Sequence, residues 1–366
     1  MTRKTEADLK VLVVDDSAVV RQFLSRVLSQ EPSIHVTSAS DPLIAMRKMS
    51  VSRPDVVVLD LEMPRMDGLT FLRTIMAENP LPVVICSSHV GRGTETALEA
   101  LREGAVDIIA KPSFGLREFL EDSALTLIDT VRAAAQAKVS RRATPFKLSA
   151  PSRKPGRLPL QTQPGAGSSG EVVVAIGAST GGPEALATVL GTMPPDAPAM
   201  VVVQHMPAAF TAPLAKRLNE SCRVEVQEAT AGARLERGKV LLSPGNRHLA
   251  VRGNGSHYWV ELSDGPLVSR HRPSVDVLFQ SVAKTAGARA VGVILTGMGD
   301  DGVAGLLAMK RAGAATIAQD EYTSVVFGMP KEALSKQAAD YALPVSRIAS
   351  FVLESSSGHN LAATGG

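Results

Sequence analysis

The sequence has little cysteine, few aromatic residues and almost no excess of either charge. Only two cysteines occur in 366 residues, Cys86 and Cys222, and neither belongs to a C-x-x-C pair. This argues against a disulfide scaffold and a cysteine-based structural zinc site, and it is typical of a reducing compartment. The formal net charge is only +3, so no overall basic field favours nucleic acid as a partner.

Long apolar runs are missing as well. No stretch reaches the roughly 18–20 apolar residues that a membrane helix needs. The N-terminal segment MTRKTEADLK contains no apolar signal sequence. We therefore expect a soluble, cytoplasmic protein that neither inserts into a membrane nor binds nucleic acid.

Short runs rich in Val and Ile alternate with helical patterns in the first part of the chain. They show little alternation between apolar and polar residues, as expected of strands that are buried on both faces. The pattern predicts a doubly wound parallel sheet, a (βα)5 domain of the α/β class over residues 1–137. The runs cover residues 11–15, 34–38, 55–60, 82–87 and 106–110.

A segment of different composition separates this part of the chain from a second region with strand-like runs. Residues 138–170 are rich in Pro, Ser, Gly and Arg without apolar periodicity, which predicts a flexible basic linker. Strand-like runs resume after it and indicate a second doubly wound α/β domain over residues 171–357, followed by a disordered tail at 358–366. A turn-rich stretch at 239–268 predicts a hairpin insertion. The runs cover residues 171–177, 199–205, 222–227, 239–243, 290–297 and 314–319, and helices are expected to begin near 183, 210, 274 and 303.

Carboxylates gather at the strand ends of the first domain. Asp15 and Asp16 end its first strand and Asp60 ends its third, so all three share one edge of a parallel sheet. They repel one another unless a cation joins them, and Mg²⁺ is a hard, oxygen-liganded ion that fits. Ser87 ends the fourth strand and Lys111 follows the fifth, which adds a hydroxyl and an ammonium able to neutralise a phosphoryl group. Helix capping explains any single aspartate, but not five residues in register.

The motifs around these residues are VLVVDDS, DVVVLDLEMPRMDG, PVVICSS and GAVDIIAKPS. Over roughly residues 9–130 they resemble the receiver domain of bacterial response regulators. The resemblance implies phosphotransfer from a histidine kinase to Asp60, with Mg²⁺ held by Asp15, Asp16 and Asp60 itself. It also implies a switch role for the Ser87 hydroxyl and a phosphate-pairing role for Lys111.

A glycine-flanked turn, GASTGG at residues 177–182, separates a strand from a helix in the second domain. A P-loop needs a lysine after its last glycine, where Pro183 stands, and the G-x-G-x-x-G fingerprint fails because Ser179 stands at its second glycine. The alternative is a nucleophilic serine. Ser179 lies midway between Gly177 and Gly181, and N–H groups at the helix start are near enough to bind an oxyanion.

A serine hydroxyl needs a base to act as a nucleophile. His205 directly follows the next strand, and Asp300 and Asp301 follow the strand run at 290–297. Hydroxyl, imidazole and carboxylate are therefore expected at one sheet edge, and their order along the chain is no objection. Spacing does not distinguish the two aspartates.

Simpler roles for the same residues remain open. Ser179 could merely cap the helix at Pro183. His248, His257 and His271 are rival bases, and His271 precedes a helix in a way that suits substrate contact or capping. We favour His205 because only it ends a strand-like run beside the serine turn.

The motifs of the second half are AIGASTGGPEAL, VVVQHMP, SPGNRHL, HRPSVDVLF, ILTGMGDDGVAGL and AQDEYTSVVFGMP. Through most of residues 171–350 they resemble the catalytic domain of protein-glutamate methylesterases, and the whole chain resembles the chemotaxis response-regulator methylesterases. The resemblance implies Ser179 as nucleophile, His205 as base and Asp301 as orienting acid. It also implies that backbone N–H groups in the loops at 177–182 and 297–299 bind the oxyanion, at Thr180, Gly181, Met298 and Gly299.

The implied function is that of a phosphorylation-regulated serine esterase, which acts on glutamyl methyl esters on the cytoplasmic helices of chemoreceptors. Deamidation of specific receptor glutamines is implied as a second activity. The enzyme would need Mg²⁺ for receiver phosphorylation and no cofactor for the ester chemistry. The receiver is expected to cover the Ser179 edge until Asp60 is phosphorylated. An anion- or nucleotide-binding module at the glycine turn is an alternative function. A DNA-binding response regulator is another, which the absence of a helix-turn-helix pattern disfavours.

Overall fold

The computed structural model describes residues 8–63, 66–88, 92–111, 117–139, 172–254 and 257–356. Of the linker predicted at 138–170, only Lys138 and Val139 lie within these ranges. The tail predicted at 358–366 lies outside them. The proposed domain boundaries therefore stay predictions.

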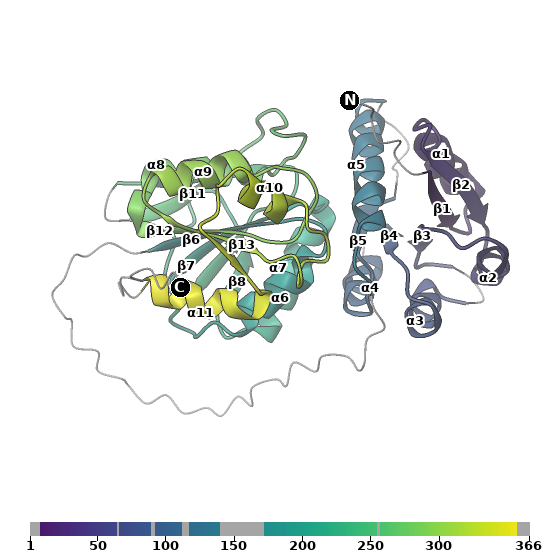
Figure 1. The fold of residues 1–366 in the computed structure, drawn as a ribbon, viewed down its shortest axis with the longest axis horizontal. Coiled ribbons are helices and arrows are strands. Elements are labelled where there is room, and N and C mark those ends of the chain that lie inside the picture. Colours follow the sequence, from purple (N-terminus) through teal and green to yellow (C-terminus); the bar gives the residue numbers. More distant parts are fainter. Residues whose placement is uncertain are drawn as a thin grey trace.

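The N-terminal domain is a parallel sheet with helices on both faces (Figure 1). Its strands lie in the order β2-β1-β3-β4-β5, which confirms the predicted doubly wound sheet. Leu12 and Val14 pack towards α2, α3 and α4, whereas Val11 and Val13 pack towards α1 and α5. The bounds are β1 (Leu9–Val14), α1 (Ala18–Leu28), β2 (Ile34–Ala39), α2 (Pro42–Val51), β3 (Val56–Asp60), α3 (Gly68–Glu78), β4 (Val83–Ser87), α4 (Arg92–Arg102), β5 (Asp107–Ala110) and α5 (Arg117–Ala135).

The C-terminal domain holds a second parallel sheet, in the order β14-β13-β12-β6-β7-β9-β8. β6 lies between β7 and β12, so the chain leaves β6 towards one neighbour and returns on the other side. Loops diverge at such a point and leave a crevice at the carboxyl ends of the strands. The bounds are β6 (Val173–Ala178), α6 (Gly182–Gly191), β7 (Ala199–Gln204), α7 (Ala208–Ser221), β8 (Glu225–Glu228), β9 (Lys239–Leu242), α8 (Val275–Thr285), β12 (Ala290–Ile294), α9 (Val303–Arg311), β13 (Ala315–Gln319), α10 (Met329–Ser335), β14 (Tyr341–Leu343) and α11 (Val345–Ser356), with a short 3-10 turn at Gly287–Arg289.

The turn-rich stretch contains a hairpin, as predicted, but not along its whole length. β10 (His248–Gly253) and β11 (Tyr258–Ser263) pair antiparallel and pack on α8. The first run in the stretch, β9, instead pairs with β7 and β8 in the main sheet. The hairpin therefore packs on α8 and forms no part of the main sheet.

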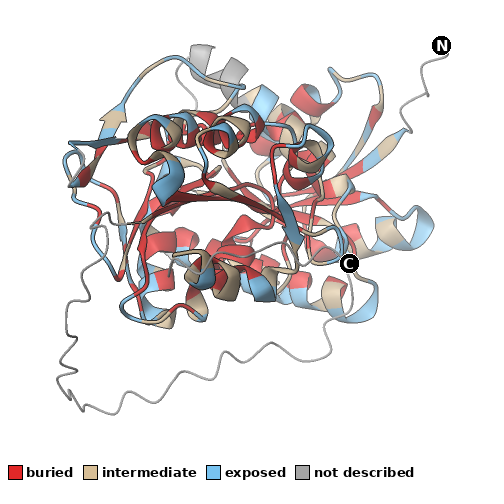
Figure 2. Ribbon diagram, turned by 60° about the vertical axis from the view of Figure 1, so that its left-hand side comes forward, coloured by how far each residue is buried: buried red, intermediate tan, exposed pale blue. Residues whose placement is uncertain are grey.

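Each face of the second sheet has its own apolar layer. Side chains of α6, α7 and α11 pack against one face, and those of α8, α9, α10 and the hairpin pack against the other. Figure 2 shows the buried residues concentrated on the strands and on the inner sides of the helices. This packing fixes the strand ends on which the candidate site depends.

The two domains share a packed contact. α4 of the N-terminal domain lies against α6 and α7, and its Leu98 and Leu101 belong to the same buried cluster as the core of those helices. Arg217 of α7 donates to the carbonyl of Leu98 at 3.0 Å and forms an ion pair with Glu184 of α6. In Figure 1, α4 and α5 stand between the first sheet and the second domain. The N-terminal domain therefore faces the second domain with its α4, β5 and α5 elements.

No helix within the described ranges is both long enough and apolar enough to cross a bilayer.

Candidate active site and the domain that covers it

Ser179 stands at the carboxyl end of β6, at the middle of the second sheet. Its N–H donates to the carbonyl of Thr296 at 3.0 Å, and its own carbonyl accepts from the Gln204 side chain at 2.9 Å. Only 9% of the surface of Ser179 is exposed to solvent. The turn is thus held from both neighbouring strands, β12 and β7.

Two N–H groups of the glycine turn already have acceptors. Gly181 has a left-handed φ of +76°, which a residue with a side chain rarely adopts. The N–H of Gly182 donates to the carbonyl of Ser179 at 2.7 Å, and the N–H of Gly181 donates to the carbonyl of Val106 at 3.2 Å. The N–H of Gly182 is therefore engaged within the turn, whereas the N–H of Gly181 is engaged only by the docked N-terminal domain.

His205 and Asp301 meet beside this turn. The His205 N–H donates to the carbonyl of Ala178, the residue before Ser179, at 3.0 Å. Nε2 of His205 lies 2.9 Å from Oδ2 of Asp301, and the side chains are only 7% and 1% exposed. The structure therefore brings together the base and the acid that the sequence proposed, next to the proposed nucleophile.

The partners of the imidazole determine its tautomer. A carboxylate accepts but cannot donate, so Nε2 of neutral His205 carries the proton and Nδ1 carries the lone pair. Nδ1 is buried and has no hydrogen-bond partner among the described residues. Nor does a hydrogen bond join Ser179 Oγ to His205 within the described part of the chain, a contact that often tightens only when substrate binds. Nδ1 is the atom available to take a proton from a serine.

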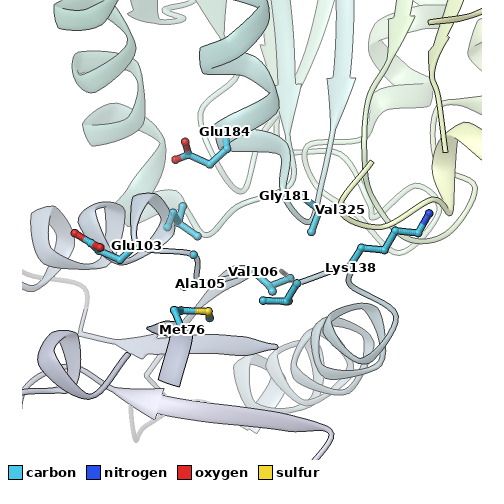
Figure 3. Close-up of a pocket in the computed structure, with 11 residues that line it drawn as sticks. Met76, Glu103, Ala105, Val106, Lys138, Gly181, Glu184 and Val325 are labelled. Atoms are coloured by element: carbon cyan, nitrogen blue, oxygen red, sulfur yellow. The ribbon is translucent and has the colours of Figure 1, made fainter. Parts of the chain in front are cut away.

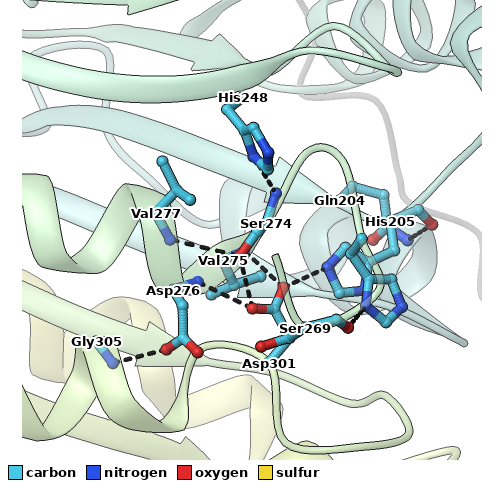
Figure 4. A network of polar contacts seen from close by, with 11 residues as sticks. Gln204, His205, His248, Ser269, Ser274, Val275, Asp276, Val277, Asp301 and Gly305 are labelled. Carbon is cyan, nitrogen blue, oxygen red and sulfur yellow. Dashed lines mark hydrogen bonds and ion pairs between the residues drawn. The ribbon is translucent and has the colours of Figure 1, made fainter. Parts of the chain in front are cut away.

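Asp301 is held by a cradle at the start of α8 (Figure 4). Its Oδ1 accepts from Ser274 Oγ at 2.7 Å and from the Asp276 N–H at 3.1 Å, while Oδ2 accepts from the Val275 N–H at 2.7 Å. Burial alone would raise the pKa of Asp301, but His205, Ser274 and Val275 donate to the carboxylate and lower it. The acid is kept ionised by donors from two elements.

The structure also separates the two candidate aspartates. Asp300 is 62% exposed, and its carboxylate pairs with Nζ of Lys336 at 3.1 Å. The sequence could not distinguish them, because adjacent residues share the same spacing. Asp301, rather than Asp300, has its side chain hydrogen-bonded to His205.

The rival histidines have other positions. His257 is exposed. His248 is buried, with its Nδ1 accepting from the Ser274 N–H at 3.2 Å and its Nε2 2.8 Å from the carbonyl of Pro266. His271 stacks on His205, with 3.8 Å between ring centroids and 11° between the planes. Burial lowers the pKa of His271 to about 4, so it is neutral at neutral pH.

His205, His271 and Asp301 have ligand-type atoms within 4.8 Å of one another, but they do not form a metal centre in this arrangement. Imidazole lone pairs lie in the plane of the ring, so two stacked rings cannot both point at a common ion. Both oxygens of Asp301 are also engaged by the donors of the cradle.

The proposed oxyanion donors lie on two sides of Ser179. The backbone at Gly297 lies directly against it, since a Cβ placed on Gly297 would be 2.6 Å from Cβ of Ser179. Met298 and Gly299 follow at the rim, half-buried and exposed respectively. Thr180 is buried, and the N–H of Gly181 is taken by Val106, a residue of the other domain.

The N-terminal domain thus reaches the nucleophile turn itself. Besides the Val106 contact, the Thr180 hydroxyl donates to Oδ2 of Asp107 at 2.7 Å. Burial raises the pKa of Asp107 to about 6, against the effects of the Thr180 and Ile108 donors and of nearby His205. Next to this contact a cavity of about 190 Å³ is lined by residues of both domains (Figure 3). The sequence did not predict the contact between Asp107 and Thr180, because Asp107 lies in an apolar run that predicts only a strand.

A further contact touches the turn that carries His271. Arg270 pairs with Asp129 of α5 at 3.2 Å, with both side chains partly exposed. Ser269 and Arg270 have φ of +50° and +65°, and the Ser269 carbonyl lies 2.6 Å from Nδ1 of His271. The N-terminal domain therefore contacts two segments next to His205: the turn that carries Ser179 and the turn that carries His271.

The acidic cluster of the first domain also converges. Asp15, Asp16 and Asp60 offer carboxylate oxygens within 4.8 Å of one another, and Nζ of Lys111 lies 2.8 Å from Oδ2 of Asp60. Burial and the charge of Asp60 raise the pKa of Asp15, although Lys111 opposes this. Ser87 is buried at the same edge, with its hydroxyl donating to the carbonyl of Gly93 at 3.1 Å. This donor set fits a hard divalent cation.

Comparisons with known proteins agree with this division of the chain. The family model for CheB methylesterase matches residues 174–352, and that for the response regulator receiver domain matches residues 11–123. A protein-glutamate methylesterase/protein-glutamine glutaminase from Anaeromyxobacter dehalogenans is 55% identical over 94% of this chain and 98% of its own length. One from Xanthomonas campestris is 52% identical over 92% of this chain and 98% of its own length.

Among solved structures, the CheB methylesterase catalytic domain of Thermotoga maritima is similar to this chain. It is 38% identical, covers 50% of this chain and 98% of its own length, and gives a TM-score of 0.50.

Proposed function

The chain belongs to the CheB methylesterase family with a receiver domain, and from this premise we propose which residues carry its chemistry. Its function is that of a phosphorylation-regulated protein-glutamate methylesterase and protein-glutamine glutaminase. Ser179 is the nucleophile, His205 the base and Asp301 the orienting acid. The observation that carries the assignment is the His205–Asp301 hydrogen bond beside the Ser179 turn, which leaves Nδ1 of His205 as the available lone pair.

The reaction follows from the tautomer. Nδ1 of His205 takes the Ser179 proton as Oγ bonds to the ester carbonyl carbon, and Asp301 stabilises the imidazolium through Nε2–H. The tetrahedral oxyanion collapses, and methoxide leaves with the proton from Nδ1 as methanol. Water then hydrolyses the acyl-enzyme with His205 again as base, which restores Ser179 and releases a glutamate carboxylate. With a glutamine, ammonia leaves in place of methanol.

The developing oxyanion needs donors that exist before the reaction. We assign this role to backbone N–H groups of Thr180, Gly181, Met298 and Gly299. Gly297 supports the assignment because it lies against Ser179 and brings the following N–H groups to the turn. Losing one such donor costs an enzyme about 3–4 kcal/mol of transition-state stabilisation.

Replacing the nucleophile tests this function. Ser179→Ala should lower methanol release from methylated receptor by at least about 10⁴-fold, because no other group can form the acyl-enzyme. As a control, the phosphorylation of Asp60 by acetyl phosphate, a reaction of the other domain, should proceed unchanged. Methanol release close to the wild-type rate would remove Ser179 from the mechanism.

The receiver domain takes its phosphoryl group at Asp60, from a histidine kinase or a small phosphodonor. Asp15, Asp16 and Asp60 would hold Mg²⁺, which supplies charge neutralisation at the phosphoryl group when it is bound. Lys111 pairs with the phosphoryl oxygens, and the Ser87 hydroxyl exchanges its bond to Gly93 for one to phosphate. The convergence of these groups at one edge supports this assignment.

The unphosphorylated receiver inhibits by covering the active site. The contacts of Val106 and Asp107 with the nucleophile turn support this proposal, since they occupy the Gly181 N–H and the Thr180 hydroxyl. Phosphorylation would favour a receiver state that binds the catalytic domain less well. Removing residues 1–140 should therefore raise basal esterase activity, and unchanged or lower activity would contradict inhibition by covering.

The substrates are glutamyl methyl esters and glutamines on the cytoplasmic helices of chemoreceptors, and the protein acts in the cytoplasm to adapt the sensory response. This reading rests on the family and on the receiver domain. We place the domains at residues 1–137 and 171–357 and the linker between them.

A further inference from the structure

Ser274 has two functions at the first turn of α8. As the N-cap, its Oγ accepts from the Val277 N–H at 3.4 Å. The single hydroxyl proton then has one acceptor, Oδ1 of Asp301, at 2.7 Å. Ser274 is fully buried, so this proton cannot be shared with solvent.

The main chain of Ser274 is fixed as firmly as its side chain. Its N–H donates to Nδ1 of His248, and Nε2 of His248 lies 2.8 Å from the carbonyl of Pro266. The carbonyl must accept, so Nε2 carries the proton and both ring nitrogens of His248 are engaged. A chain of hydrogen bonds therefore runs from Pro266 through His248 and Ser274 to Asp301 and His205.

Helix capping alone does not account for a hydroxyl at this position. Aspartate caps helices as well as serine does, but it would place a second carboxylate against Asp301. A hydroxyl caps the helix and also donates to the carboxylate. The arrangement needs a group that does both.

We propose that Ser274 is a positioning residue of the catalytic triad, whose hydroxyl holds the Asp301 carboxylate in the orientation that receives Nε2–H of His205. The inference rests on the proposed function, because it concerns the same triad. Ser274 touches neither the substrate nor the reacting atoms and acts only through Asp301. It follows that the serine of the motif HRPSVDVLF is required by the reaction as well as by the fold.

The test measures kcat and KM against pH for methanol release by the full chain, activated with acetyl phosphate and Mg²⁺, on methylated receptor. Ser274→Ala should lower kcat about tenfold with KM unchanged, as expected for losing a hydrogen bond to a charged group. The acidic limb of the kcat profile should move to higher pH, because Asp301 with one donor fewer is protonated more easily. Ser274→Thr keeps the hydroxyl and should restore both.

Ser281→Ala is the matched control. Ser281 is a buried serine of the same helix, which accepts from the Val251 N–H and donates to the Leu278 carbonyl, with no contact to Asp301. It should lower the melting temperature and leave kcat and the pH profile unchanged. If Ser274→Ala behaves as Ser281→Ala does, Ser274 is only a structural cap and the proposal is wrong.

Ser274→Gly provides a second variant if Ser274→Ala fails to fold, since glycine is tolerated at an N-cap. Its rate of labelling by a serine-reactive fluorophosphonate should fall in parallel with kcat. Wild-type labelling would overturn the proposal. Ser179→Ala separates the two levels: if it stays active the proposed function fails, and if it is inactive while Ser274→Gly is normal only this inference fails.

Discussion

Asp15 and Asp301 both follow a strand of a parallel sheet and both are 1% exposed, yet their pKa values move in opposite directions. Asp15 faces Asp60 and has a raised pKa, which burial and the like charge cause. Asp301 receives hydrogen bonds from Ser274, Val275, Asp276 and His205 and has a lowered pKa. The depth of burial therefore does not determine the state of a carboxylate, whereas its donors do.

The difference separates two kinds of site. The acidic edge of the receiver holds carboxylates that repel one another, and a bound cation would relieve that repulsion. The Asp301 carboxylate of the proposed triad already has its donors in place. One site is built to respond to a ligand, whereas in the other the carboxylate that contacts His205 is already oriented before a ligand binds.

Replacing Asp301 should break the completed site with the largest effect. Asp301→Asn can offer an amide N–H where Nε2–H of His205 needs an acceptor, so the imidazole takes the wrong tautomer. We expect kcat for methanol release to fall about 10⁴-fold. Asp300→Asn, the neighbouring acid that pairs with Lys336, should stay near wild type. Equal losses in both variants would refute the assignment.

A backbone change should displace the nucleophile without touching the triad's hydrogen bonds. In Gly297→Ala the new Cβ would lie 2.6 Å from Cβ of Ser179 and 2.5 Å from Sδ of Met329. We expect kcat to fall about 100-fold, as a misplacement of about 1 Å can cost. Gly265→Ala, where only His248 lies nearby at 3.7 Å, is the control. Full activity of Gly297→Ala would show that Ser179 is less tightly held than its contacts indicate.

The same substitution should have opposite effects on stability at the two sites. Asp15→Asn removes a repelling charge, so the free energy of unfolding of the receiver should rise by about 1 kcal/mol without Mg²⁺. Asp301→Asn breaks a buried pair and should lower that of the catalytic domain by about 3 kcal/mol. Urea unfolding followed separately in each domain measures both.

The contributions of Asp15 and Asp301 to folding stability should also depend on pH in opposite directions. A raised pKa means that the folded receiver binds more protons than the unfolded chain, so the stability from Asp15 falls as the pH rises from the ordinary value of 3.8 through the raised one. The stability from Asp301 is present above 3.8 and is lost as the pH falls through its lowered pKa. Mg²⁺ should stabilise the wild type more than Asp15→Asn. Stabilisation of both to the same extent would contradict a metal role for Asp15.

The smallest effect is expected at the interface between the domains. Burial raises the pKa of Asp107 from its ordinary value of 3.8 to about 6 in the docked arrangement. If undocking returns this carboxyl to water, the docked state binds more protons, and closure should weaken as the pH rises through this window. Asp107→Asn remains neutral and still accepts from Thr180, so it should close about fivefold more tightly at pH 7.5. Hydrogen exchange at residues 177–182 measures the closure.

The two proteins should differ little in this measurement at pH 5, where the wild-type carboxyl is mostly protonated. Faster exchange in Asp107→Asn at pH 7.5 would show that the charged carboxylate, rather than the neutral group, holds the domains together.

The sequence was sufficient for the features that depend on local pattern. The strands of both sheets except β14, and the turn around Ser179, follow from apolar runs and glycines. His205 follows from its place after β7. These are properties of a few consecutive residues. The three residues of β14 (Tyr341–Leu343) lie outside the predicted strand-like runs, so the sequence did not predict this edge strand. The parallel order of the strands then brings their ends to one edge.

Other features depend on packing that no local pattern encodes. Ser274 and Asp301 are far apart along the chain, and the cradle exists only because α8 begins beside the loop after β12. Asp107 meets Thr180 only because two domains dock. His271 stacks on His205 through a turn with two left-handed residues, Ser269 and Arg270, whose backbone conformation the sequence did not indicate.

The hydrogen bond from the Gly181 amide to the Val106 oxygen joins two main-chain atoms. Every amino acid carries that oxygen, so exchanging the side chain at 106 does not delete the acceptor. The proposed inhibition by the receiver should therefore persist when the side chains around this contact are replaced, and only a change in how the two domains pack would remove it.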